Sequence, residues 1–324
     1  MTLEISVAVP ELEKIKKRVL DKTGFNLSYF KPTFLSRRIN VRMKVLNITN
    51  GSEYADLLKS ESDEISSLYD SISIHVTRFF RDKQVWDTLS KNIVTKLFDG
   101  GINKTIRIWS AGCATGEEPY SIAIMLQDFL QDKNYKIKII ATDINSHFLT
   151  EAKKGVFSIN ALQNLNSNQI KKYFSNSGRD QYKINKKIKD MITFQLGDIG
   201  TCPASYLDAV FCRNLLIYYN SNAQDLILNK FHQVIKENKF LILGMDESLL
   251  GNKNYKNFVP LFPREKIYQK RSSADQLSSL ISKGKREFLK KNVQQKRSST
   301  DLLSTIISQR SKNKKWLEEL HKEF

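Results

Sequence analysis

The sequence predicts an α/β fold, in which a mostly parallel β-sheet is covered by helices on both faces, carries a small β insertion and follows an all-α domain. Three observations predict it. Apolar residues recur at helical spacing through residues 1–75. From Lys104 onward, short β-branched segments alternate with helical ones, which is typical of a parallel sheet. A turn containing Gly112 and Gly116 joins the first such strand to the next helix.

The N-terminal segment is expected to form helices only. Apolar spacing predicts helices over residues 12–20, from Pro32 to about residue 46, from Ser52 to residue 58, and through residues 65–68. Proline is tolerated in a first helical turn, so Pro32 suits a helix start. Ser52 follows an Asn-Gly turn and is expected to cap the third helix.

The second part of the chain is expected to supply the sheet. Strands are predicted over residues 106–109, 137–142, 192–195, 207–212 and 240–243, with residues 266–269 as a final edge strand. Helices are predicted over residues 119–130, 145–154 and 223–235. Residues 157–192 interrupt the alternation and predict a small β-subdomain. We therefore divide the chain into residues 1–75, a helical domain, residues 76–270, a catalytic domain, and residues 271–324, a tail.

Composition favours a cytoplasmic globular protein. Hydrophobic residues make up 40% and charged residues 27% of the chain. No apolar run approaches the roughly 20 residues of a membrane span, and no secretory signal is evident. The three cysteines, at positions 113, 202 and 212, lack metal-ligand spacing, so we expect reduced thiols and no metal site.

The tail is basic and contains a repeat. It contributes +7 of the net charge of +18, and residues 271–282 recur as residues 297–308. Each copy places serine before an amphipathic helical pattern. Two interpretations stay open: a partly ordered basic appendage, or a pair of short helices that dock on a partner.

The glycine turn is followed by two carboxylates, Glu117 and Glu118, at the start of a helix. No Gly-Lys-Ser/Thr follows, so the turn does not match a phosphate loop. Acids here would repel a phosphate and attract a cation, which suits the sulfonium and ammonium groups of S-adenosylmethionine. Alternatively, they are ordinary acids favoured by the helix dipole. Asp143 ends the next strand, where a carboxylate can accept both ribose hydroxyls; helix capping is its alternative role.

Five segments together resemble the chemotaxis receptor methyltransferases, the CheR family. They are Val76–Asp82 (VTRFFRD), Trp109–Ser121 (WSAGCATGEEPYS), Ile140–Ile144 (IATDI), Phe211–Tyr219 (FCRNLLIYY) and Leu243–Leu249 (LGMDESL). The resemblance covers about residues 10–270 and not the tail. It implies a class I (Rossmann-like) methyltransferase that uses S-adenosyl-L-methionine, yields S-adenosyl-L-homocysteine, and esterifies glutamate side chains of methyl-accepting receptors for chemotactic adaptation.

The resemblance also implies cofactor contacts. Thr77 and Arg81 would reach the methionine end, with Arg81 on the carboxylate and Glu117 on the ammonium. Asp143 would bind the ribose. The remaining contacts implied are Asp198 and Ile199 beside the adenine, Arg213 and Asn214 beneath the cofactor, and His75, where the family usually has asparagine.

The implied acceptor is a glutamate carboxylate, which has a pKa near ~4.3 and is ionised at neutral pH. No general base is then required, and catalysis depends on alignment and on excluding water. Arg213 or Tyr218 could orient the acceptor, although Tyr218 could equally be a core residue. A basic helix from Phe34 to Lys44 would steer acidic receptor helices. The short segment 173–184 predicts no tether to a receptor C-terminal peptide.

Two other functions stay open. The charge is compatible with a nucleic-acid methyltransferase, but Arg213-Asn-Leu-Leu216 stands where such enzymes carry an Asn/Asp-Pro-Pro-aromatic motif, so we expect no nucleic-acid partner. A noncatalytic module that binds the cofactor or its product is disfavoured by intact Glu117, Asp143 and Asn214.

Overall fold

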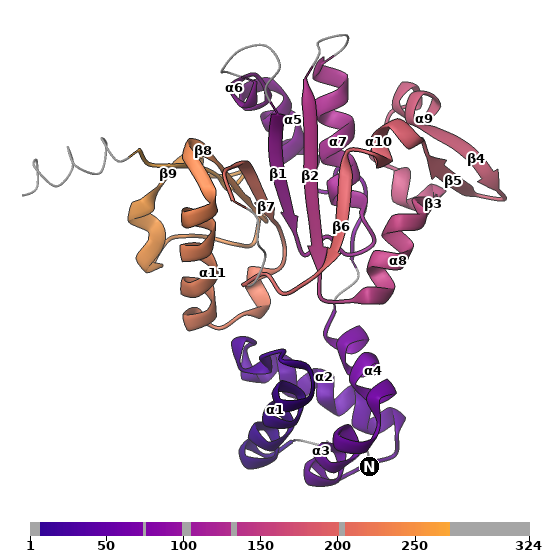
Figure 1. Cartoon of the computed structure of the whole chain (residues 1–324), viewed down its shortest axis with the longest axis vertical. Coiled ribbons are helices and arrows are strands. Elements are labelled where there is room, and N and C mark those ends of the chain that lie inside the picture. Colours follow the sequence, from indigo (N-terminus) through magenta and orange to yellow (C-terminus); the bar gives the residue numbers. More distant parts are fainter. Residues whose placement is uncertain (1–6, 74–75, 99–104, 131–134, 201–204, 273–324) are drawn as a thin grey trace, which may run out of the picture. The chain divides into compact units, whose positions relative to one another are not determined.

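The computed structural model describes residues 7–73, 76–98, 105–130, 135–200 and 205–272 (Figure 1). The chain divides into two compact units, Met1–Lys270 and Arg271–Phe324. Cys202, His75 and residues 273–324, which hold all but the first two residues of the repeat, lie outside the described residues.

Four α-helices form the N-terminal part: α1 (Val9–Thr23), α2 (Pro32–Val45), α3 (Gly51–Ser60) and α4 (Ser62–Ile72), with a 3₁₀ turn, η1 (Leu27–Tyr29), after α1. Pro32 occupies the first turn of α2, as predicted. The expected cap of α3 was wrong. Asn50 is the cap, because its side chain accepts hydrogen bonds from the backbone N–H groups of Ser52 and Glu53.

Seven strands form one sheet in the order β6-β2-β1-β7-β8-β10-β9. Their bounds are β1 (Thr105–Ala111), β2 (Lys136–Asp143), β6 (Ile192–Leu196), β7 (Leu207–Cys212), β8 (Ile235–Leu243), β9 (Phe258–Phe262) and β10 (Ile267–Lys270). The first five in this order are parallel and β10 is antiparallel to both its neighbours. The predicted parallel sheet is confirmed. The predicted edge position of β10 was wrong, because β9 pairs outside it.

Helices cover both faces of this sheet (Figure 1). They are α5 (Lys83–Asn92), α6 (Val94–Leu97), α7 (Glu117–Leu130), α8 (Ser146–Lys154) and α11 (Ser221–Val234), with 3₁₀ turns η3 (Leu216–Tyr218) and η4 (Lys253–Asn257). Successive strand residues point to opposite faces. Ile108 therefore packs in one core with α5 and α7, whereas Trp109 packs in the other with α11 and the N-terminal helices. The sequence patterns had not predicted α5 and α6.

The predicted insertion is confirmed as a separate antiparallel sheet in the order β3-β5-β4. It comprises β3 (Val156–Ser158), η2 (Ile159–Leu162), α9 (Ser167–Tyr173), β4 (Phe174–Gly178), β5 (Gln181–Ile184) and α10 (Lys186–Lys189). Asp128 on α7 anchors it by accepting hydrogen bonds from Gln169, Lys172 and Tyr173. In the part of the chain that the structure describes, no helix is both long and apolar enough to cross a membrane.

The register brings the carboxyl ends of the central strands to one edge. Ala111 pairs with Thr142, Asp143 pairs with Leu196, and Cys212 pairs with Leu243. Residues that directly follow these strands consequently lie side by side, at the edge where open α/β sheets bind ligands.

Candidate functional site

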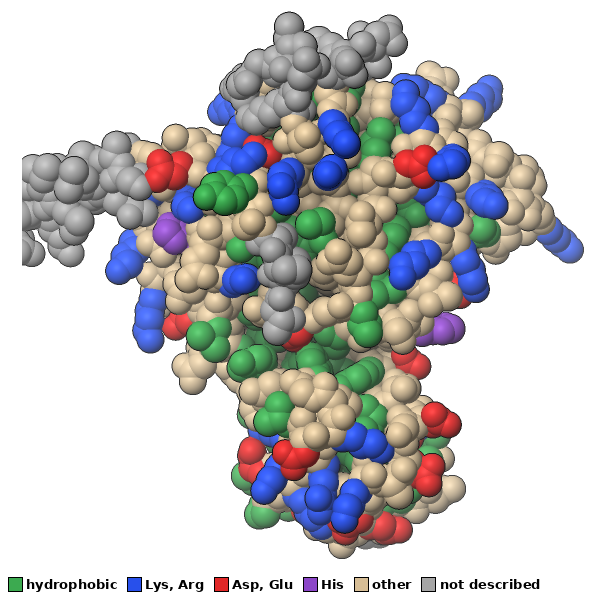
Figure 2. Space-filling model, in the orientation of Figure 1, with side chains coloured by type: hydrophobic (Ala, Val, Ile, Leu, Met, Phe, Trp, Pro, Cys, Tyr) green, Lys and Arg blue, Asp and Glu red, His purple; other side chains and the backbone are tan. Residues whose placement is uncertain are grey.

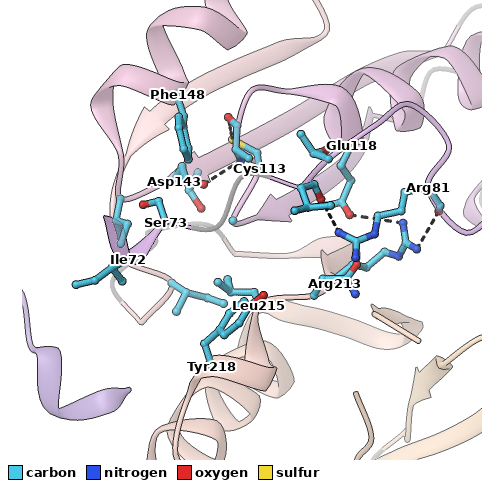
Figure 3. A pocket seen from close by; sticks show the side chains of 18 of the residues that line it. Ile72, Ser73, Arg81, Cys113, Glu118, Asp143, Phe148, Arg213, Leu215 and Tyr218 are labelled. Carbon is cyan, nitrogen blue, oxygen red and sulfur yellow. Dashed lines mark hydrogen bonds and ion pairs between the residues drawn. The ribbon is translucent and has the colours of Figure 1, made fainter. Parts of the chain in front are cut away.

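A pocket of about 1000 Å³, counting its open mouth, lies at this edge of the sheet. Its walls come from the end of α4 and the segment after it, the glycine turn, the end of β2, the loop after β6 and the loop after β7. Figure 3 shows Asp143 on one side, Glu118, Arg81 and Arg213 on the other, and Tyr218 and Leu215 between them.

The backbone of the glycine turn packs closely against β2 and against the loop after β7. Gly112 and Gly116 have φ values of 77° and 99°. The N–H groups of Gly112 and Cys113 both donate to the Thr142 carbonyl, which fastens the turn to β2. A Cβ on Gly112 would lie 2.7 Å from Leu215 Cδ2, so a larger residue would force the Leu215 side chain to move. Burial raises the pKa of the Cys113 thiol, which therefore stays protonated.

Asp143 lines the pocket and is held by the backbone. Its Oδ2 accepts from Ala114 N at 2.9 Å, and its Oδ1 from Asn145 N at 3.0 Å. Burial raises the pKa of this carboxyl, and these backbone hydrogen bonds oppose the shift. The cap of α8 is Asn145, whose Oδ1 accepts from the N–H groups of His147 and Phe148. Because Asn145 caps the helix, the side chain of Asp143 is not needed as a cap and can face the pocket.

The two successive glutamates lie in different places. Glu118 lines the pocket, accepts a hydrogen bond from Ser110 Oγ at 2.7 Å and lies 3.9 Å from Arg213 Nη1. Burial raises its pKa, and Arg213 and Ser110 oppose the shift. Glu117 is buried and accepts from Thr115 Oγ1 at 2.7 Å, and it is not among the pocket-lining residues. Glu118 therefore lies in the pocket wall, whereas Glu117, the predicted ammonium partner, lies outside it.

Arg213 is engaged by the protein itself. Its Nη2 donates to Asp82 Oδ2 at 2.7 Å and to the Arg81 carbonyl at 3.0 Å, and its guanidinium lies 5.6 Å from the centre of the Trp86 ring. Only 2% of the side chain is exposed. This arrangement fixes the turn at residues 80–82 beneath the pocket, whose wall includes Arg213.

Tyr218 lines the pocket beside the N-terminal helices. Its ring centre lies 4.8 Å from that of Phe34 on α2, and its carbonyl accepts from Lys31 N at 2.9 Å. Burial raises its pKa against the opposing effect of Arg81 and Arg38, so its hydroxyl is protonated at neutral pH. A protonated hydroxyl can donate a hydrogen bond to a carboxylate.

The other predicted residues are divided between two places. Thr77, Arg81, Ile199 and Asn214 line the pocket. Asp198 lines a neighbouring cavity beside α11, and its Oδ1 accepts from Gly200 N. Among the residues described, no cluster of three or more histidine, cysteine or acidic side chains could hold a metal ion.

Comparison with known proteins accounts for both parts of the first unit. Residues 10–73 match the model of the CheR methyltransferase all-alpha domain, and residues 75–263 match that of the CheR methyltransferase SAM binding domain. The chain belongs to the CheR methyltransferase family. It is accordingly a methyltransferase that depends on S-adenosylmethionine, and a nucleic-acid methyltransferase is not favoured.

Three relatives of this methyltransferase carry the name "Chemotaxis protein methyltransferase". The one from Borreliella burgdorferi is 34% identical over 80% of this chain and 95% of its own length. The Listeria innocua protein is 31% identical, over 76% of this chain and 95% of its own. The Escherichia coli protein is 28% identical, over 76% of this chain and 87% of its own.

The residues of the pocket suit this cofactor. Its ammonium and sulfonium call for acidic neighbours, and the pocket wall carries two partly buried carboxylates, Asp143 and Glu118, on opposite sides (Figure 3). Its carboxylate calls for a cation, and Arg81 lies on the same side as Glu118. The sequence had not assigned Glu118 to the site, because two adjacent helical residues point about 100° apart and only the helix phase decides which one faces the pocket.

Proposed function

We propose that this enzyme transfers a methyl group from S-adenosylmethionine to glutamate side chains in the cytoplasmic helical region of methyl-accepting chemotaxis receptors. Membership of the family and the printed names of the relatives support the proposal. The observation that carries it is the pocket itself, which has acids for the cofactor inside and arginines beside Tyr218 for an anionic acceptor. Receptor methylation of this kind would place the protein in the cytoplasm.

The cofactor assignments are part of this proposal. Asp143 would accept hydrogen bonds from the ribose, Glu118 would hold the ammonium, and Arg81 would bind the carboxylate. Arg81 Nη1 donates to the Val76 carbonyl at 2.6 Å, which restrains the side chain and leaves other donors for the ligand. Further contacts would come from Thr77, Ile199 and Asn214 in the pocket wall. Asp198 and His75, which lie next to Ile199 and close to Thr77 in the sequence, are also proposed contacts.

The acceptor would bind between Tyr218 and the arginines of α2. The Arg38 guanidinium lies 5.5 Å from the centre of the Phe34 ring, and that ring packs on Tyr218. Arg38 Nε is buried, and no hydrogen-bond partner is found for it among the residues described. A glutamate carboxylate attracted by the Arg38 guanidinium would accept a hydrogen bond from the Tyr218 hydroxyl, which would aim one oxygen at the methyl group.

The bound cofactor supplies an activated methyl group. The acceptor arrives ionised, so the protein has only to align the reacting atoms and exclude water. Neither Arg213 nor Tyr218 has to remove a proton. Arg213 contributes by holding Asp82 and the Arg81 carbonyl.

Transfer of radioactive methyl groups from S-adenosylmethionine to receptor-bearing membranes tests the function. We expect base-labile label on a receptor-sized band, because methyl esters hydrolyse in base. Unmethylatable receptors whose modified glutamates are replaced by alanine are the control and should stay unlabelled. Cofactor binding without any transfer would contradict the proposal, as would base-stable label. Binding to nucleic acid that weakens steeply as the salt concentration rises would instead support nucleic acid as the acceptor.

A further inference from the structure

Glu247 connects two loops that are far apart in the sequence. It lies just after β8, and only 4% of it is exposed. Its Oε1 accepts from Leu215 N at 2.8 Å and Leu216 N at 2.6 Å, and its Oε2 accepts from Asn214 N at 3.1 Å. Oε2 also accepts from Gly244 N. One carboxylate thus binds four backbone N–H groups and joins the loops that follow the adjacent strands β7 and β8.

The loop after β7 needs such an acceptor. Asn214 has φ of 59°, in the left-handed region, and the change of direction there turns three successive N–H groups toward one point. Consecutive N–H groups arranged in this way form a concave site that favours an anion. Without an acceptor they would remain buried and unpaired, which is unfavourable. Burial raises the pKa of Glu247, and the four hydrogen bonds oppose that shift.

Gly244 provides the space for this contact. A Cβ at this position would lie 2.6 Å from Asn214 N and 2.8 Å from Glu247 Oε2. Any larger residue would therefore separate the two loops. The glycine and the glutamate act on the same loop by different means, one through its size and the other through its charge.

The loop held in this way carries residues of the pocket. Asn214 and Tyr218 line it, and Leu215 fills the space against Gly112 of the glycine turn. We propose that Glu247 is a positioning residue that holds residues 213–218 in the geometry that binds S-adenosylmethionine and orients the acceptor. This inference rests on the proposed function and adds a residue to which no role in the site had been given.

Four variants of the full chain test the inference: Glu247→Gln, Glu247→Asp, Gly244→Ala and the control Asp208→Asn. Asp208 is another buried carboxylate; it lies at the opposite end of β7 and accepts from Lys236 Nζ at 2.9 Å and Arg107 N at 3.0 Å. Three quantities are measured for each: the thermal midpoint of unfolding, the Kd for S-adenosylhomocysteine by calorimetry, and kcat and KM for receptor methylation.

We expect Glu247→Gln to raise the Kd about tenfold and to lower kcat on the order of 10- to 100-fold, because the loop shifts. Glu247→Asp, which keeps the charge on a shorter side chain, should recover part of both losses. Gly244→Ala should give the same pattern with the carboxylate intact. Asp208→Asn should lower the thermal midpoint while the Kd and kcat stay within about twofold of wild type.

A folded Glu247→Gln variant with the Kd and kcat of wild type would overturn the inference. Equal losses of affinity in Asp208→Asn would also overturn it, since they would reveal a general effect of stability. If Glu247→Gln does not fold, Gly244→Ala decides by the same measurements. Wild-type protein that binds S-adenosylhomocysteine but does not methylate receptors would contradict the proposed acceptor. In that case the Kd values of wild type and the variants would still test the positioning role of Glu247.

Discussion

Two adjacent glutamates at the start of α7 have different surroundings. Glu118 contacts Ser110 and faces the pocket, whereas Glu117 contacts Thr115. We expect Glu118→Gln to raise KM for S-adenosylmethionine about tenfold or more, because the ammonium loses a charged partner in a buried site. Glu117→Gln is the matched control and should change KM less. Initial rates at varied cofactor concentration measure both, and a larger effect in Glu117→Gln would reverse the assignment.

Asp143 makes stability depend on pH in the cofactor-free protein. Burial raises its pKa above the unfolded value, so the folded state binds the proton more tightly. Its contribution to stability is complete below the unfolded pKa and is lost as pH rises through the folded pKa. We therefore expect the free energy of unfolding of wild type, relative to Asp143→Asn, to increase as the pH is lowered from neutral toward 3.8, the ordinary pKa of an aspartate. Urea unfolding of both proteins measures this, and a difference independent of pH would contradict it.

At the scale of elements, α2 presents both structural and exposed cations. Arg42 is bound by Glu64 through two hydrogen bonds, at 2.9 and 2.6 Å, so it belongs to the core of the helical domain. Arg37 and Lys44 are exposed. Figure 2 shows cations of this domain at the surface, interspersed with acids. The part of α2 able to attract an acidic receptor helix is thus smaller than its composition suggests.

Reversal of charge on α2 should weaken the encounter with receptor. We expect Arg37→Glu to lower kcat/KM for receptor about fivefold at low salt, with a smaller effect at high salt, because screening reduces attraction between exposed charges. The KM for S-adenosylmethionine should not change. Lys91→Glu, an equal reversal at an exposed position on α5, is the control. Equal losses in both variants would indicate an effect of net charge rather than of α2.

Some helices and strands were predicted from the sequence and others were not. The parallel strands were predicted because buried β-branched segments alternate with helices. The position of β10 was mistaken because an antiparallel strand can turn back between two others, and local sequence does not record its neighbours. Among the α5 residues, Val85, Trp86 and Leu89 follow helical spacing and could have revealed that helix.

At the scale of the whole molecule, the site is completed by contacts that no local pattern contains. Most of the predicted contacts line one pocket, since motifs that follow parallel strands meet at one edge. Glu247 was given no role, because three of its four partners are backbone N–H groups about 30 residues away in the chain. Backbone donors have no sequence signature, and only the fold reveals them.

The tail should be separable from catalysis. The family models end at residue 263, and residues 271–324 form a distinct unit that carries +7 of the net charge. We expect a chain ending at residue 270 to bind S-adenosylhomocysteine with the Kd of the full chain and to retain receptor methylation. Calorimetry and the methyl transfer assay compare the two. A truncated protein that is folded but binds no cofactor would show that the catalytic fold extends into the tail.

One amide group connects the N-terminal helices to the cofactor side of the sheet. Asn145 Nδ2 donates to Asp70 on α4 at 2.7 Å, while its Oδ1 caps α8 directly beside Asp143. Deamidation of Asn145 would leave the helix cap intact, because aspartate caps as well as asparagine does. It would, however, exchange a hydrogen-bond donor for a second carboxylate facing Asp70. Chemical ageing at this single position would thus leave every helix and strand in place and replace an attraction between the two domains by a repulsion.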